Sequence, residues 1–400
     1  MRFFASCLLL LAVGPARAQC AKKVPVAQAV ARAEAQYAGY LRQYPDSTLH
    51  PRSIGADGTL HRTTSRNWTS GFFAGNLWYL AALSGHPRWQ RPAAAFTETL
   101  APEQFVTTTH DLGFILNDSY GLGYAQTQDP AYKAVIIQGA RSLATRFSPT
   151  VGAIRSWDHN AQKWAYPVIV DNLMNLEMLF AASQLSGDTT FAHIAKAHAN
   201  TDMRYRFRPD GSTFHVLGFD PATGQLSRAG THQGYADGTC WARGQGWAIY
   251  GYTMLYRETG DPRYLATARR AADYFLTQTA RIADHIPYWD FNDPGIPNVP
   301  RDASAAAVAA SGLLELSKYV PKKAGKAYCQ EATTMLRSLC SPAYLAEAGT
   351  NNFYLLKHST GNMPEKSEID APLVYADYYF LEALWRYQHY DDLPAALKRS

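Results

Sequence analysis

Two aspartates have the setting that acid/base chemistry needs. Asp111 and Asp171 each stand directly before an apolar run that is typical of a buried helix. An aspartate there usually caps the helix. Asp171, however, follows Val170 and precedes Leu173 by two positions, and a charged side chain among apolar neighbours is costly without a role. Two carboxylates among aromatic residues can supply a general acid and a general base for sugar chemistry.

A second group of residues has the composition of a sugar-binding site. Trp241, Arg243 and Trp247 follow one another at positions i, i+2 and i+6 in a glycine-containing segment. Indole rings stack on sugars, and an arginine can bind a ligand carboxylate through two hydrogen bonds. Arg243 could equally pair with a structural carboxylate of the protein. The predicted substrate contacts are His215, Gln233, Trp241, Arg243 and Trp247.

The sequence contains no motif for a serine hydrolase, a nucleotide-binding site or a metal site. No serine lies in a G-x-S-x-G context, and the chain has neither a P-loop nor G-x-G-x-x-G. No C-x-x-C or His/Cys cluster suggests a metal. Cys329 and Cys340 lie in one predicted helix about 16 Å apart, too far for a bridge. We therefore expect neither a disulfide nor a zinc site.

The composition is that of a globular protein. The 400 residues are 47% hydrophobic and 18% charged, too apolar for disorder and too polar for several membrane spans. The net charge is +5, and no basic block points to nucleic acid. Nine Trp, 25 Tyr and 17 Phe favour an aromatic-lined carbohydrate site, although a large core would also use many of them.

The N-terminus reads as a secretory signal peptide. Arg2 precedes an apolar run, and Ala16 and Ala18 form an A-x-A cleavage site. This predicts an exported protein, periplasmic or secreted, whose single domain spans residues 19–400. Cys20 raises the alternative of a lipid anchor, but the residues before it form a poor lipobox. No later run is long and apolar enough to span a membrane.

Helix punctuation recurs along the chain. A helical run ends, a short turn such as Gly260-Asp261-Pro262 follows, and a second helical run begins, as expected for helical hairpins. The second runs are amphipathic, whereas the first runs are apolar or small throughout: 71–83, 112–125, 173–185, 242–256, 303–316 and 372–384. Six buried helices alternating with six amphipathic ones predict an all-α (α/α)₆ barrel. Irregular spacing disfavours the alternative, an open α-solenoid.

This topology predicts where the site lies. The six inner helices run in the same direction, so the loops that precede them gather on one rim. Those loops contain many of the Trp and polar residues, and we expect the active site there. Strand signals are confined to short segments such as 212–219 and 352–357.

Four segments resemble the unsaturated glucuronyl hydrolases of glycoside hydrolase family 88. They are HDLGF (110–114), VDNLMNLEMLF (170–180), HQGYADGTCWARGQGW (232–247) and EIDAPLVYADYYFLEAL (368–384). The resemblance implies an (α/α)₆ barrel and an exo-acting enzyme without a metal or organic cofactor. Such an enzyme removes the Δ4,5-unsaturated uronic acid that polysaccharide lyases, including those acting on glycosaminoglycans, leave on oligosaccharides.

The resemblance also implies a mechanism, in which the C4=C5 vinyl ether is hydrated. Asp171 takes the place of the general acid/base, and Asp111 that of the second carboxylate, which orients the sugar. Physical chemistry agrees, because a second carboxylate and apolar walls both raise the pKa of an aspartate. The family's substrate contacts carry over to the five residues already named and, on a looser alignment, to Trp68, Trp157 and His110.

Some alternatives remain open at this point. Lys366 and Ser367 lie where some relatives recognise a sulfated neighbouring sugar, although Glu365 beside them would repel sulfate. The nearest rival is an unsaturated rhamnogalacturonyl hydrolase with the same barrel and chemistry. Others are an ordinary glycosidase or epimerase and a non-enzymatic carbohydrate-binding protein, which would not need a buried Asp171.

Overall fold

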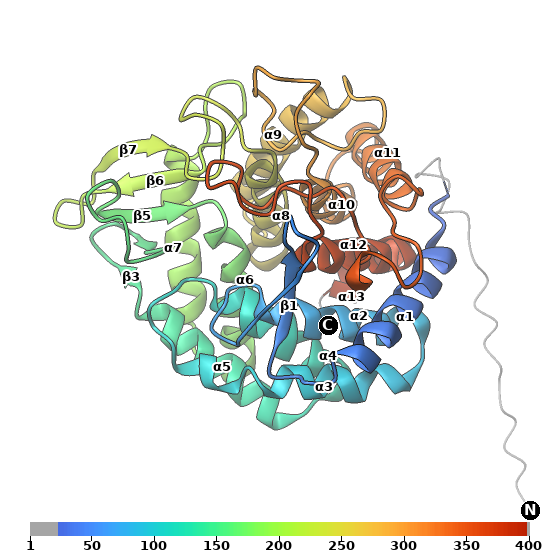
Figure 1. Cartoon of the computed structure of the whole chain (residues 1–400). Coiled ribbons are helices and arrows are strands. Elements are labelled where there is room, and N and C mark those ends of the chain that lie inside the picture. The colour runs from blue at the N-terminus through green and yellow to red at the C-terminus, as the bar shows by residue number, and fades with distance from the viewer. Residues whose placement is uncertain (1–22, 398–400) are drawn as a thin grey trace, which may run out of the picture.

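An inner ring of helices closes on itself (Figure 1). The computed structural model describes residues 23–397. Each inner helix packs against the next, and the last packs against the first, as the predicted barrel requires. The ring consists of α2 (Ser70–Ser84), η4 with α4 (Gly113–Gly121, Leu122–Thr127), α6 (Asn172–Ser186), α8 (Ala242–Thr259), α10 (Ala303–Leu316) and α12 (Val374–Gln388).

An outer layer of helices surrounds this ring. Five of them follow an inner helix as predicted: α3 (Gln90–Glu98), α5 (Pro130–Ala144), α7 (Thr190–Tyr205), α9 (Pro262–Thr279) and α11 (Lys322–Leu339). The sixth comes from the other end of the chain. It is α1 (Val26–Gln43), which packs on α2, and its Tyr37 hydroxyl donates to Asp377 of α12 at 3.4 Å. After α12 the described chain adds only η6 (Tyr390–Asp392) and α13 (Leu393–Leu397), too little to build an outer helix.

The predicted punctuation is confirmed at the turns. Asp129 and Asp261 cap α5 and α9, accepting the backbone N–H of Ala131 at 2.8 Å and of Arg263 at 2.9 Å. Gly260 ends α8 with a left-handed φ of 68°, which favours glycine. Single residues therefore fix where α8 stops and α9 begins. Within residues 23–397 no helix is long and apolar enough to cross a bilayer.

Short strands decorate the barrel. A three-stranded antiparallel sheet has the order β5 (Tyr166–Ile169), β6 (Val216–Phe219), β7 (Leu226–Gly230), and β6 lies within the predicted segment 212–219. The second predicted segment, 352–357, is not a strand: η5 (Asn351–Phe353) has positive φ angles and turns there. The other elements are β1 (His50–Ile54) and β2 (Leu60–Thr63), β3 (Phe147–Ser148) and β4 (Ala153–Ile154), η2 (Pro87–Trp89) and η3 (Ala101–Phe105).

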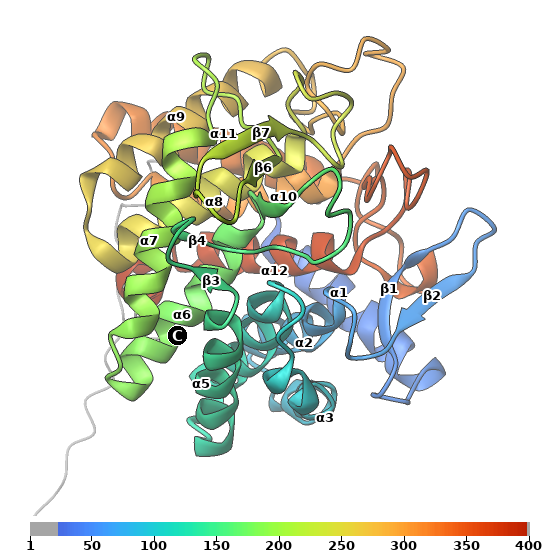
Figure 2. The same cartoon turned by 90° about the vertical axis from the view of Figure 1, so that its left-hand side faces the viewer.

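The β1–β2 hairpin lies beside the chain that leads into α12, because Ser53 bridges Leu373 (Figure 2). β1 and β5 each contain a proline, which disfavours strand interiors, so sequence patterns did not predict either strand. Both strands nevertheless bear on the site, β5 by preceding Asp171 and β1 by packing near the loop before α12.

Buried ion pairs join the inner helices at the end of the barrel opposite the predicted rim. Glu315 of α10 accepts from Arg257 of α8 at 3.0 Å and from Arg386 of α12 at 2.9 Å. Arg386 also donates to Glu382 at 3.2 Å. Arg257 is fourteen residues after Arg243 in α8, which is about 21 Å along a helix. This network is therefore remote from the first turns of the inner helices.

The expectation of no disulfide is wrong for Cys329, which is disulfide-bonded. Cys240 and Cys340 are free, so the expected absence of a Cys329–Cys340 bridge holds. Spacing within one helix bears only on the Cys329–Cys340 pair, and it does not reveal a pairing with a residue distant in sequence.

Candidate active site

A pair of strands places Asp171 beside His215. β5 ends at Ile169, and Val170 then donates its N–H to the carbonyl of His215 at 3.1 Å. Asp171 follows at the N-cap position of α6, but its side chain makes no capping bond. Its Oδ2 instead lies 3.6 Å from Nε2 of His215. The ordinary role of an aspartate at a helix start does not apply to Asp171.

Backbone contacts define the protonation of His215. Its Nδ1 accepts the N–H groups of His232 at 3.2 Å and of Gln233 at 3.1 Å. A nitrogen that accepts carries no proton, so we infer that the neutral ring holds its proton on Nε2. Burial lowers the pKa of His215 well below its ordinary value, which keeps the ring neutral. His215 thus presents a fixed N–H donor on the side of Asp171.

The surroundings of the Asp171 carboxyl group favour its protonated form. The residue is 8% exposed, and its Oδ2 has no hydrogen-bond partner. Burial raises the pKa of Asp171 to about 7; Arg243 opposes this rise and the nearby Asp111 adds to it. At neutral pH the group is therefore divided between acid and carboxylate, as a general acid/base requires.

Asp111 is held nearby in a different environment. The Thr109 hydroxyl donates to its Oδ2 at 2.8 Å, and Nε2 of His110 lies 3.2 Å from its Oδ1. Burial raises the pKa of Asp111 to about 6, against the hydrogen bond from Thr109 and the charge of Arg146. The two predicted carboxylates are thus near enough for the charge of Asp111 to raise the pKa of Asp171.

Asn175 connects the two segments that carry these aspartates. Its Oδ1 accepts the N–H of Phe114 at 2.9 Å, and its Nδ2 donates to the carbonyl of Asp171 at 3.3 Å. The contact needs glycine at position 113, because a Cβ there would lie 2.6 Å from Cα of Asn175. Phe114 is the second residue of η4, a rare π-helix, so its N–H has no acceptor within that helix and Asn175 supplies one.

Replacing Asn175 by alanine is expected to lower kcat by about 10²-fold, because small displacements of catalytic groups have effects of that size. The N–H of Phe114 would lose its acceptor, and the starts of η4 and α6 would no longer be tied together. Steady-state kinetics measure this. Asn76→Ala is a matched control, since Asn76 is a buried asparagine of the inner helix α2. Loss of stability in both variants with wild-type kcat in both would contradict the positioning role of Asn175.

Arg243 pairs with a carboxylate of the protein, the structural alternative left open by the sequence. Its Nη1 donates to Asp302 at 2.7 Å and to the carbonyl of Thr360 at 2.6 Å, and its Nη2 to the carbonyl of Gly361 at 2.7 Å. Both N–H groups of Nη1 are thus used within the protein, so a ligand carboxylate that bound Nη1 would have to replace one of these partners. Contact between Arg243 and substrate stays a prediction.

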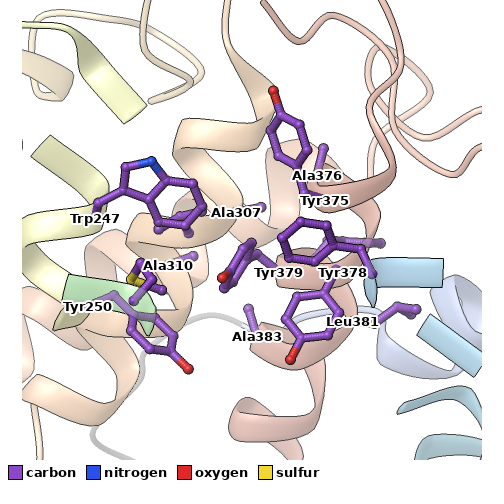
Figure 3. Close-up of a cluster of buried hydrophobic side chains, with 14 of the residues drawn as sticks. Trp247, Tyr250, Ala307, Ala310, Tyr375, Ala376, Tyr378, Tyr379, Leu381 and Ala383 are labelled. Atoms are coloured by element: carbon purple, nitrogen blue, oxygen red, sulfur yellow. The ribbon is translucent and has the colours of Figure 1, made fainter. Parts of the chain in front are cut away.

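The tryptophans differ in access. Trp68 is half-buried against Tyr375 and Phe114, with ring centroids 5.0 and 5.6 Å away, and keeps some exposed surface. Trp241 is 3% exposed and lies under the Arg243 guanidinium, 4.4 Å away. Trp247 has no exposed surface and packs within the buried cluster of α8, α10 and α12, against Tyr379 (Figure 3). Protein side chains thus cover the ring on which a sugar was expected to stack, and its Nε1 is left unpartnered.

The remaining predicted residues lie around the loop of residues 358–370. Gln233 donates to the carbonyl of Gly361 at 3.0 Å, and the ring of Trp157 lies 5.6 Å from that of His232. His232 is in turn 3.5 Å from Glu365 in the loop. Lys366 is exposed at the tip, and Ser367 pairs with Asn362 across it. The loop therefore contacts the predicted site residues through Gly361, and Lys366 is exposed to solvent.

Unpartnered buried polar atoms gather at this site. Such atoms are rare in proteins and usually have a functional explanation. Of those in the described residues, the following belong to the predicted site: Nδ1 of His110, Nε1 of Trp157, Oδ2 of Asp171, Nε2 of His215 and Nε1 of Trp247. A sugar with hydroxyl and carboxylate groups would supply partners for the first four of these atoms, whereas Nε1 of Trp247 is enclosed by protein side chains. Among residues 23–397, which the structure describes, no group of three His, Cys, Asp or Glu side chains is arranged to hold a metal.

Sequence reasoning missed Asn175, Asp302 and Tyr375. Asn175 is a polar residue in an otherwise apolar helical run, which was a usable signal. Asp302 stands directly before an alanine-rich inner helix, as Asp171 stands before its own. Tyr375 lies within a resembling segment, yet its contacts with Trp68 and Arg243 join residues far apart in sequence.

Comparisons with known proteins place the chain among enzymes of one family. Residues 46–254 match the Glycosyl Hydrolase Family 88. An unsaturated glucuronyl hydrolase of Formosa agariphila is 47% identical over 85% of this chain and 84% of its own. An unsaturated chondroitin disaccharide hydrolase of Streptococcus pneumoniae is 33% identical over 80% of this chain and 81% of its own. The crystal structure of an unsaturated glucuronyl hydrolase specific for heparin superposes with a TM-score of 0.89 at 44% identity, covering 92% of this chain and 98% of that one.

Proposed function

This chain belongs to Glycosyl Hydrolase Family 88 and is a glycoside hydrolase, and we propose that it removes Δ4,5-unsaturated uronic acid from the non-reducing end of lyase-generated oligosaccharides. One observation carries the proposal. The buried Asp171, able to hold a proton near neutral pH, has an unpartnered oxygen 3.6 Å from the N–H-bearing nitrogen of His215. That arrangement suits protonation of a carbon atom by an acid held away from water.

The proposed reaction hydrates the double bond. The Asp171 carboxyl group gives its proton to C4, and water adds its oxygen to C5 while its proton returns to the Asp171 carboxylate. The resulting C5 hemiketal opens at the C5–O5 bond to a ketone, and the hemiacetal left at C1 expels the aglycone as an alcohol. Asp111 orients the sugar and supports the raised pKa of Asp171. The N–H of His215 orients the reacting water or a sugar oxygen.

The pH dependence follows from the two states of Asp171. Because burial raises the pKa of Asp171 to about 7, the acid form is lost above that pH, and no proton is available for C4. We expect kcat to fall as pH rises through about 7. Loss of the ultraviolet absorbance of the conjugated double bond, followed across pH, measures this. A kcat that rises through that range would contradict Asp171 as the acid.

The aglycone is best identified with a panel of lyase products. The named relatives act on heparin-derived and chondroitin-derived sugars, so we propose a glycosaminoglycan disaccharide as the substrate. Absorbance loss should occur with a chondroitin, hyaluronan or heparin product. Loss with a rhamnogalacturonan product alone would assign the chain to the rhamnogalacturonyl alternative. Lys366 is exposed and could attract a sulfate group, but Glu365 beside it would repel one. The same panel of substrates therefore tests whether the enzyme prefers sulfated sugars.

We also propose that the protein is exported. The predicted signal peptide, residues 1–18, lies outside the described residues, as does Cys20. N-terminal sequencing of the exported protein should begin at Gln19. A mature protein that begins with a lipidated Cys20 would replace this proposal by the lipid-anchor alternative.

A further inference from the structure

The only carboxylate that pairs with Arg243 in the described chain is that of Asp302. Oδ2 of Asp302 accepts from Nη1 of Arg243 at 2.7 Å. The two side chains are 0% and 1% exposed, so water screens neither charge. The guanidinium lies between the rings of Trp241 and Tyr375, 4.4 and 5.3 Å from their centroids. A buried arginine without this carboxylate would act as a full positive charge.

Asp302 is itself fixed by the helix that it begins. Its Oδ1 accepts the N–H groups of Ser304 and Ala305 at 3.0 and 3.3 Å, and the Ser304 hydroxyl at 2.5 Å. Oδ1 therefore caps α10 and also accepts the N–H of Thr360 at 3.4 Å, whereas Oδ2 binds Arg243. The carboxylate cannot turn away from the arginine without breaking the cap.

The same arginine holds the loop of residues 358–370. Arg243 donates to the carbonyls of Thr360 and Gly361, and the Gly361 carbonyl also accepts from Gln233 at 3.0 Å. The far side of the loop is tied to β1, because Glu368 accepts from Arg52 at 2.7 Å and Ser53 at 2.8 Å. Any movement of Arg243 would therefore reach both the loop and Gln233.

The charges around Asp171 come from each element packed near it. Arg243 approaches from α8, Asp111 with its neighbour His110 from the start of η4, His215 from the start of β6, and Arg206 from the end of α7. Arg206 is already neutralised by Asp202 at 2.5 Å, both fully buried. His110 and His215 are neutral, because burial lowers the pKa of each. Among these groups, Arg243 is thus the cation whose charge Asp302 neutralises.

We propose that Asp302 is a positioning residue, which neutralises Arg243 beside Asp171 and fixes that guanidinium against the Thr360–Gly361 backbone. The proposal rests on the proposed function only in assigning the acid to Asp171. It predicts that removing the carboxylate of Asp302, with the helix cap kept, stabilises the Asp171 carboxylate and makes the acid form harder to keep at neutral pH.

Two substitutions keep the cap and remove the charge: Asp302→Asn and Asp302→Ser, since both residues cap helices well. We expect the alkaline limb of the kcat profile to move down by about one pH unit and KM to rise about tenfold. Adding Arg243→Gln to either variant removes the uncompensated charge, and the limb should return to its wild-type position or above it. Asp302→Glu keeps the charge and should leave the limb in place.

A control and a second measurement separate this role from a structural one. Glu315→Gln weakens a buried arginine pair at the opposite end of the barrel, and it should lower stability without moving the limb. The pKa of Asp171 can also be obtained without turnover, from the pH at which the stability difference between wild type and Asp171→Asn levels off. The same difference is then measured in the Asp302→Asn background.

The outcomes distinguish the two proposals. A levelling point that moves down in the Asp302→Asn background supports the positioning role, even if no panel sugar is turned over and the proposed function fails. The positioning role would be overturned if an active and folded Asp302→Asn or Asp302→Ser enzyme kept both the alkaline limb of its kcat profile and the pH at which the stability difference levels off. That result would leave the proposed function intact.

Discussion

We expect the Asp171→Asn variant to turn over substrate about 10³-fold more slowly than wild type while binding it with similar affinity, because the amide can neither give a proton to C4 nor take one from water. Asparagine has nearly the same shape, so the contacts that bind the sugar remain. Absorbance loss at saturating substrate measures kcat, and calorimetric titration of the variant measures affinity. A fall in affinity with an unchanged kcat would instead make Asp171 a binding residue.

The matched control is Asp377→Asn. Burial also raises the pKa of Asp377 to about 7, but its oxygens accept the N–H groups of Leu355 and Leu356 at 2.8 and 2.9 Å. This substitution should lower stability and leave kcat within a few-fold of wild type. The two aspartates thus share burial and differ in whether an oxygen is left free.

Stability gives Asp171→Asn a second signature. Burial raises the pKa of Asp171 in the fold from 3.8 to about 7, so wild-type stability falls as pH rises between those values. Asparagine has no charge to bury. The variant should therefore unfold at a higher temperature than wild type at about pH 8, and the difference should shrink towards about pH 4.

Two replacements of His215 separate its two nitrogens. In His215→Asn the amide oxygen can occupy the Nδ1 position and still accept from His232 and Gln233, but the Nε2 donor is lost. We expect kcat to fall about 10²-fold, as when one preorganised donor is removed from an active site. In His215→Gln the amide can reach the Nε2 position, and the backbone acceptor is lost instead.

The glutamine variant should show the opposite pattern. Its kcat stays within a few-fold of wild type, while KM rises about tenfold because Gln233 and the loop that it contacts are less well held. Steady-state kinetics on both variants measure the contrast. Equal kcat losses in the two would show that the ring as a whole matters and that the donor on Nε2 has no separate role.

Local sequence patterns were enough for most of the barrel. The apolar run 303–316 coincides with α10, and Asp261 with Pro262 begins α9, because these features depend only on neighbouring residues. The sixth outer helix, α1, could not be placed in this way, since it completes the outer layer through contacts with η5 and α12, far along the chain. The disulfide of Cys329 was missed for the same reason.

The site shows the same division. Asp171 and Asp111 were identifiable because charged residues at the start of apolar helices are conspicuous in the sequence. The tautomer of His215 depends on backbone N–H groups of residues 232 and 233, and the pairing of Arg243 depends on Asp302, fifty-nine positions away. Polar contacts of this kind join residues far apart in the chain and leave no periodic pattern in the sequence, so they could not be predicted from it.

Turnover in deuterium oxide, followed by NMR, tests the central claim most directly. If Asp171 protonates C4 and water adds at C5, the sugar released by the wild-type enzyme carries one deuterium at C4, delivered to a single face, and the double bond disappears as the aglycone is freed. Asp171→Asn should give neither change at a comparable rate. A released sugar that still contains the C4=C5 double bond, with no deuterium at C4, would show direct cleavage of the glycosidic bond and contradict the hydration mechanism.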